Sequence, residues 1–246
     1  MAAAESALIR MREKRFYLIT ALLFPLAILI GFGRTYYLKT FTGAPPLSSY
    51  LVHIHGAIMT MWVLLYIAQV YLVRSKQIRL HQTLGFAGIG LAVLIVVCGF
   101  FTAIAAAKNG ASTPGPPDIP RMSFLIVPMF DLVTFAVLFT AAVYYRKRAA
   151  NHKRLMLVIA IGFLPPALAR IPLSVIQSLG PLFFFGVPTL LMIFAIVYDR
   201  LQNGKFNKVL IYSSLFLIAS YPLRLLVMGT EIWLAFANWV VGFSLV

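Results

Sequence analysis

Seven long runs of apolar residues divide the chain, and each approaches or exceeds the about twenty residues that a helix needs to cross a bilayer core. They cover residues 16–36, 48–73, 80–107, 122–145, 155–179, 181–198 and 209–228. A Gly- and Pro-rich stretch separates the third run from the fourth, whereas only a Leu-Gly-Pro corner at 179–181 separates the fifth from the sixth. The pattern predicts an all-α, polytopic transmembrane helix bundle of about seven spans.

The composition excludes several other classes of protein. Hydrophobic residues make up 61% of the 246 residues, charged residues make up 11%, and the mean hydropathy is +0.92. A water-soluble fold of this length cannot bury so much apolar surface, which rules out a soluble enzyme. The apolar runs are continuous, whereas an outer-membrane barrel shows short alternating segments. We expect a single transmembrane domain over residues 1–246.

The basic residues gather on alternate connections between the runs. Of the 21 Lys and Arg residues, 15 lie before the first run and on the three connections that share its side, and four lie on the opposite connections. Because cytoplasmic loops are enriched in Lys and Arg, the N-terminus is predicted to be cytoplasmic and the segment from Lys108 to Arg121 periplasmic. The net charge of +15 is thus explained by topology in a bacterial inner membrane, without nucleic-acid binding.

The two ends of the chain need separate interpretation. The basic start resembles a signal peptide, but it lacks a small-residue cleavage site and is interpreted as a retained first span. Residues 230–246 carry Glu231, Trp233 and Trp239. This segment is either an interfacial helix or part of a further span, and nothing in the sequence indicates an oligomeric state.

Polar residues at membrane depth are the first candidates for function, because a charge facing lipid costs several kcal/mol. By helical rise, His53, His55, Arg170 and Arg224 fall in the outer half of the membrane, with Asp131 nearer the midplane. Asp131 can neutralise one arginine. The second arginine then needs carbonyl oxygens, Glu231 or an anion. These polar residues either hold the helices together through an internal ion pair, or form an anion-binding pocket for haem propionates, a quinone or a carboxylate.

The two outer histidines are candidate metal ligands. Positions i and i+2 of a helix point about 200° apart, so His53 and His55 cannot both bind one ion from a regular helix. His55 and Met59 do share a face, and a His/Met face can ligate copper or haem iron. The alternative is a histidine that hydrogen-bonds between helices, with Met59 as packing.

A second pair of histidines lies on the cytoplasmic side. His81 begins the third run and His152 precedes the fifth. Two imidazoles on different helices can ligate one haem iron from opposite faces, although solvated interfacial side chains explain the pair as well. Cys98 is the only cysteine and is expected to be a buried, inert thiol.

Three motifs carry a resemblance: HIHG with QVYLVR downstream, LHQTLG, and NHKRLM. They resemble a group of uncharacterised bacterial multi-pass membrane proteins that is loosely similar to cytochrome b561-like and oxidase-assembly membrane proteins. The resemblance covers residues 51–99 and 151–156. In b561-like proteins, histidines on different helices ligate two haems, one near each membrane face. The resemblance implies a similar role for the outer and inner histidine pairs of this chain.

Three functions remain open from the sequence. The first is a haem-binding, electron-transferring membrane protein, with a quinone or a redox protein as partner and copper as the alternative cofactor. The second is a transporter or channel that uses Asp131, Arg170 and Arg224 for an anion or a proton. The third is a non-catalytic assembly or sensory subunit. No catalytic motif is present, so an enzymatic activity, if there is one, would be that of a membrane oxidoreductase.

Overall fold

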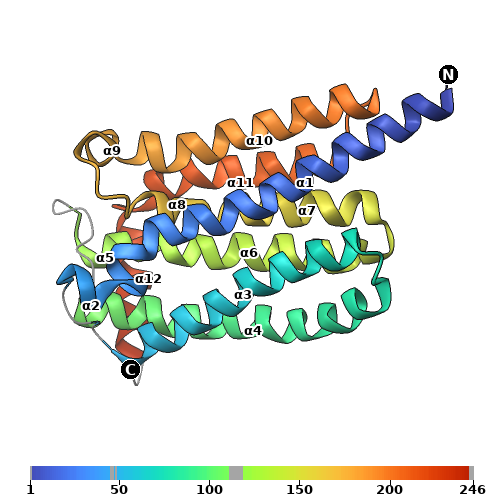
Figure 1. Ribbon diagram of the computed structural model, residues 1–246. Helices are drawn as coiled ribbons and strands as arrows, with labels where there is room; N and C mark the ends of the chain where they lie inside the picture. The colour runs from blue at the N-terminus through green and yellow to red at the C-terminus, as the bar shows by residue number, and fades with distance from the viewer. Residues whose placement is uncertain (1, 45–46, 48, 111–118, 244–246) are drawn as a thin grey trace.

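The structure, a computed structural model, describes residues 2–44, 47, 49–110 and 119–243, and every regular element in them is a helix (Figure 1). The predicted all-α helix bundle is confirmed. Six helical stretches among the described residues are long and apolar enough to cross a membrane. Many large apolar side chains on these helices are exposed, as expected of surfaces that face lipid. Length and composition therefore identify an integral, multi-pass membrane protein.

The six long stretches are built on the following helices: α1 (Ala2–Phe32), which continues into the π-helix η1 (Gly33–Tyr37), α3 (Tyr50–Arg74), α4 (Ile78–Asn109), α6 (Ile126–Tyr144), α10 (Pro181–Asn203) and α11 (Lys208–Val227). The shorter elements are α2 (Lys39–Thr42), α5 (Arg121–Phe124), the 3-10 helix η2 (Tyr145–Lys147), α7 (Ala149–Gly162), α8 (Leu164–Leu168), α9 (Ser174–Leu179) and α12 (Glu231–Phe243).

The fifth predicted span, residues 155–179, runs from one end of the bundle to the other as three short helices, and not as one continuous helix (Figure 1). Helix α7 ends at Gly162, α8 covers only Leu164–Leu168, and α9 begins at Ser174. Pro165 and Pro166 cannot donate backbone hydrogen bonds to the preceding turn, which interrupts the helix at that point. The Gly180 corner before α10 does occur, with a positive φ of 50°.

The broken segment nevertheless forms the centre of the bundle. Helix α7 packs against α1, α6, α10 and α11, and α8 packs against α1 and α10. Every residue from Leu157 to Ile161 is buried. A stretch of helix that is apolar on every side, as residues 157–161 are, packs in a core, whereas the neighbouring long helices each expose one side.

Close backbone contact fixes the position of α8 against α1. A Cβ atom added to Gly31 would lie 2.2 Å from the carbonyl oxygen of Ala167 and 2.6 Å from its carbonyl carbon. No side chain can occupy that space without moving the backbone. Glycine at position 31 is therefore required for α1 to reach the central segment.

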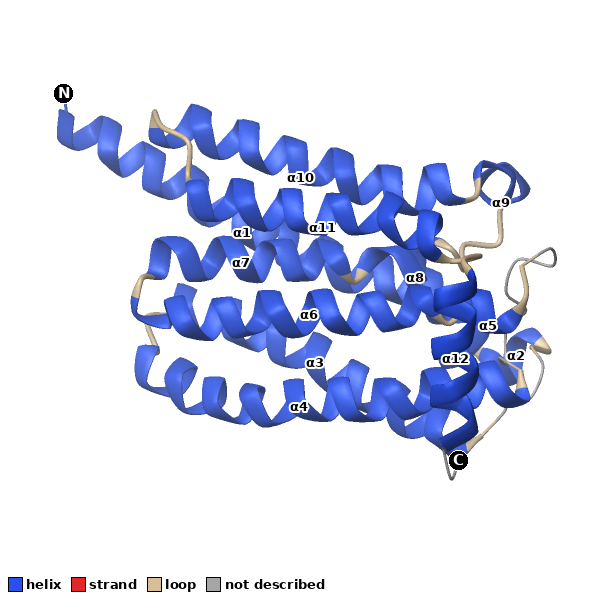
Figure 2. Ribbon diagram, turned by 180° about the vertical axis from the view of Figure 1, so that it is seen from behind, coloured by secondary structure: helices blue, strands red, loops and turns tan. Residues whose placement is uncertain are grey.

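The two ends of the bundle differ in charge and in structure. The N-terminus and the connections 75–77, 145–148 and 204–207 lie at one end, here called the basic end (Figure 1). Helices α2, α5, α9 and α12 lie at the opposite end, and α12 runs across the ends of the long helices (Figure 2). This arrangement favours the interfacial reading of residues 230–246, of which 244–246 lie outside the described residues. Residues 111–118 of the predicted periplasmic segment also lie outside them.

The orientation of the bundle can be tested with two cysteine variants in a Cys98→Ala background. Ser75 at the basic end and Ser178 at the opposite end are both exposed. Because basic loops stay in the cytoplasm, Ser178→Cys should react with an impermeant thiol reagent in intact cells with a permeabilised outer membrane, and Ser75→Cys only after lysis. The reverse labelling pattern would invert the predicted topology.

Candidate functional site

The first turn of α7 connects several helices through consecutive side chains. Asn151 accepts a hydrogen bond from Asn207 at 3.1 Å, and Asn207 caps the N-terminus of α11 through the amide of Leu210 at 3.0 Å. The next residue, His152, hydrogen-bonds through Nδ1 to the carbonyl oxygen of Ala142 on α6 at 2.8 Å. Two adjacent residues of α7 thus hold two different neighbouring helices.

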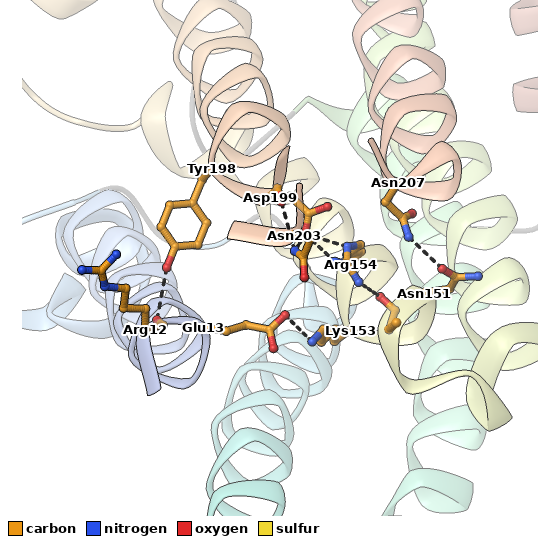
Figure 3. A network of polar contacts seen from close by, with 10 residues as sticks. Arg12, Glu13, Asn151, Lys153, Arg154, Tyr198, Asp199, Asn203 and Asn207 are labelled. Carbon is orange, nitrogen blue, oxygen red and sulfur yellow. Dashed lines mark hydrogen bonds and ion pairs between the residues drawn. The ribbon is translucent and has the colours of Figure 1, made fainter. Parts of the chain in front are cut away.

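The following two residues of α7 hold two more helices through ion pairs (Figure 3). Lys153 pairs with Glu13 on α1, and Arg154 pairs with Asp199 on α10, with Nε and Nη2 at 2.8 and 2.5 Å from Oδ1. Asn203, one turn beyond Asp199, donates to the same carboxylate oxygen at 3.1 Å. We call residues 151–154 and these partners the α7 hub.

The Arg154–Asp199 pair is buried, and sequence reasoning missed it. Arg154 is only 4% exposed and Asp199 is 7% exposed, although both fall just outside the predicted apolar runs. Asp199 Oδ2 has no hydrogen-bond partner among the described residues, and it borders a cavity of about 10 Å³ that Tyr17 and Gln202 also line. A space of this size holds about one water molecule.

His81 and His152 are brought together at the basic end. Their ring centroids are 6.5 Å apart and the rings are inclined at 77°, although the residues come from α4 and α7. The Ala142 carbonyl oxygen can only accept, so His152 Nδ1 donates to it. His81 Nδ1 is buried without a partner among the described residues. The two rings therefore differ, because one is oriented by the backbone of α6 and the other has a buried nitrogen without a hydrogen bond.

The outer histidines do not converge. The exposed His53 ring lies near Tyr36 and Tyr50, with centroids 6.3 and 6.5 Å away. His55 turns towards α4, where its Cε1 would be 3.6 Å from a Cβ atom on Gly99. His55 Nδ1 is buried and has no partner within the described part of the chain. This divergence is the one expected for positions i and i+2 of a helix.

Met59 and the glycines of α4 serve packing. Met59 packs against the main hydrophobic core, so the expected His55/Met59 face lies among apolar side chains. Gly85 and Gly88 face Gln69 and Leu65 on α3, which shows that the small residues allow α3 to approach α4. In the described ranges, no group of three or more His, Cys, Asp or Glu residues is arranged to hold a metal ion. Cys98 is a half-buried free thiol.

Asp131 and Arg224 form an ion pair between α6 and α11, with Nη1 2.6 Å from Oδ1. The Arg224 side chain is completely buried, and it also donates to the carbonyl oxygen and hydroxyl of Ser220 at 3.2 and 3.1 Å. Three aromatic rings surround the guanidinium with centroids 5.3–5.8 Å away: Phe130, Phe185 and Tyr221. A haem propionate would have to displace Asp131 to reach this arginine.

Arg170 lies beside the break that follows α8. It donates to the carbonyl oxygen of Pro166 at 2.7 Å, and its guanidinium lies 4.7 Å from the centre of the Phe32 ring. Gln177 donates to the carbonyls of Ala169 and Ile171 at 3.1 and 2.9 Å. Side chains therefore satisfy the carbonyl oxygens of Pro166 and Ala169, for which the interrupted helix provides no amide, whereas the Ile171 carbonyl also accepts from the amide of Leu173 at 2.9 Å. Glu231, considered from the sequence as a partner for the second arginine, is exposed at the start of α12.

No protein family, characterised protein or solved structure matches the chain. The candidate site therefore rests on the geometry of its own residues.

The Asp131–Arg224 pair gives a first prediction. Asp131→Asn leaves a buried arginine unpaired and should lower the free energy of unfolding by about 3–5 kcal/mol. Asp131→Asn combined with Arg224→Gln should recover part of this loss, measured as apparent melting temperature in detergent. Arg170→Gln is the matched control and should add independently to Asp131→Asn. Additive effects for Arg224 as well would contradict the interaction.

The α7 hub gives a second prediction, because its two ion pairs differ in burial. Asp199→Ala isolates the buried Arg154 and should cost about 3–5 kcal/mol. Glu13→Ala removes the partner of Lys153, whose side chain is 33% exposed, and should cost at most about 1 kcal/mol. Thermal inactivation of the two purified variants gives the comparison. Equal losses would show that burial does not set the strength of these contacts.

Proposed function

We propose that this integral membrane protein binds a haem between His81 and His152 and transfers electrons near the basic end of the bundle. The observation that supports the proposal is the 6.5 Å separation of the two imidazole rings, which come from different helices. Two imidazoles that bind one metal ion from opposite sides at about 2 Å per bond have ring centres about 6 Å apart. The separation of the rings is close to this value.

The shortage of further ligands favours haem over a bare metal ion. A bare ion in a protein site usually takes four or more ligands, and the described residues offer no group of three ligand side chains. A porphyrin supplies nitrogen ligands of its own, so His81 and His152 would be the only side chains needed to hold the iron. Copper bound by two histidines is the alternative that the experiment below distinguishes.

The protein groups around the pair have definite roles in this proposal. The Ala142 carbonyl fixes the orientation and tautomer of His152, which is the usual second contact of a ligating imidazole. The α7 hub holds the helix that carries His152. The haem iron would accept and release one electron.

Basic residues close to the pair would neutralise the haem carboxylates. They lie on the two connections beside His81 and His152 and on the adjoining helix ends: Arg74, Lys76, Arg79, Arg146, Lys147 and Arg148. Charge-assisted hydrogen bonds from such groups bind carboxylates strongly. The electron partner in this proposal is a quinone or a redox protein on the cytoplasmic side of a bacterial inner membrane, where the charge asymmetry puts the basic end.

The transporter or channel function considered from the sequence has less support. A transport site needs a charge that a substrate can reach, whereas Arg224 is completely buried and paired with Asp131. The divergence of His53 and His55 likewise removes the basis for a shared ligand site at the opposite end. The inner histidine pair is therefore the arrangement on which the proposal relies.

A visible spectrum tests the proposal directly. Protein purified from haem-replete cells should show a Soret band and sharpened α and β bands on reduction, as a low-spin haem with two imidazole ligands does. His81→Ala and His152→Ala should each abolish or shift these bands. His53→Ala is the matched control and should leave the spectrum unchanged, because His53 lies at the opposite end.

Two results would overturn the haem assignment. One is a well-folded protein that remains colourless after expression with added haem. The other is stoichiometric copper, measured by elemental analysis, that His152→Ala removes while no haem is present. A spectrum that responds to His53→Ala and not to His81→Ala would move the haem to the opposite end.

A further inference from the structure

Helix α12 (Glu231–Phe243) packs one face against the end of the bundle. Trp233 donates through Nε1 to the carbonyl oxygen of Met122 at 2.9 Å, and Ala237 is completely buried. Val240 and Val241 are buried on the same side. The helix is therefore held firmly across the ends of the long helices (Figure 2).

The outward face of α12 is also apolar. Ile232, Phe236, Trp239 and Phe243 are exposed by 84%, 45%, 59% and 75%. They occur at i, i+4, i+7 and i+11, so they form one stripe, and the Trp239 ring contacts Phe236 and Phe243 at centroid distances of 6.0 and 5.3 Å. In water, this continuous stripe would be an unfavourable surface.

We propose that α12 is an interfacial helix, with this stripe embedded at the boundary between headgroups and acyl chains of the leaflet at the opposite end. Its 13 residues extend about 20 Å, which is too short to cross a core of about 30 Å. Its position across the helix ends puts it at the level of the membrane surface, where tryptophan is enriched. Phe41 and Tyr50, at the same end, are exposed by 88% and 87% and add to this aromatic level.

A lipid surface suits the stripe better than a second copy of the chain. One face of a helix of this length presents on the order of 200 Å². A stable protein interface buries about 800 Å² on each partner. The stripe also lacks charged side chains that would select a protein partner, since Glu231 is the only acidic residue of α12 and the helix has no basic one.

The three tryptophans of the chain allow a direct test in bilayers. A variant with Trp62→Phe and Trp233→Phe retains Trp239 as the only emitter. Reconstituted in phosphatidylcholine vesicles with bromine at different acyl depths, its fluorescence should be quenched most by bromine nearest the headgroups. The matched control retains only Trp62, which is 3% exposed and should be quenched weakly at every depth.

Two outcomes would overturn the proposal. Strongest quenching by bromine near the bilayer centre would make α12 part of a span. Quenching by aqueous iodide alone, or by no quencher, would put the stripe in water or against another protein. If the tryptophan variants do not fold, Trp239→Cys in a Cys98→Ala background, labelled with a nitroxide, gives the same depth from oxygen and nickel accessibility. This test does not depend on whether haem is bound.

Discussion

The bundle depends on the first turn of α7, where four consecutive residues each hold a different helix. Residues 151–154 contact α11, α6, α1 and α10 in turn. Consecutive side chains of a helix point about 100° apart, so only a helix surrounded on all sides can make such contacts. Leu155 and every residue from Leu157 to Ile161 are buried for the same reason. Polar contacts at the membrane surface thus orient a helix that apolar packing alone would leave free to rotate.

The arginines inside the bundle form ion pairs or hydrogen bonds with nearby groups. Arg224 pairs with Asp131 and donates to Ser220, whereas Arg170 donates to the carbonyl oxygen of Pro166. Such partners are expected, because an unused donor in the hydrocarbon region is costly. An unpartnered nitrogen does not by itself distinguish the histidine pair, since His55 Nδ1 and Asp199 Oδ2 also lack a partner in the described residues. The pair differs because two imidazole rings from α4 and α7 lie 6.5 Å apart. That geometry is the reason for assigning function to the histidines and structure to the arginines.

Hydrophobic pattern alone predicted the helix class and the approximate limits of six spans. It did not predict that the fifth is divided into α7, α8 and α9, because an apolar run indicates burial in lipid or in protein equally and Pro165 and Pro166 interrupt the helix. The buried position of Asp199 was not predicted, since Asp199 stands just after an apolar run and its partner Arg154 is far away in sequence. The same-side position of His81 and His152 was predictable, but their contact depends on how α4, α6 and α7 pack.

The hub makes the spacing of residues 151–154 along α7 a fixed quantity. Inserting or deleting one residue within this turn would rotate the two parts of α7 on either side of the change by about 100° relative to each other. If the side chains before the change kept their partners, Arg154 would point away from Asp199 on α10. Most surface loops tolerate changes of length because only their ends are constrained. A change of length inside this turn would instead break contacts to more than one helix at once.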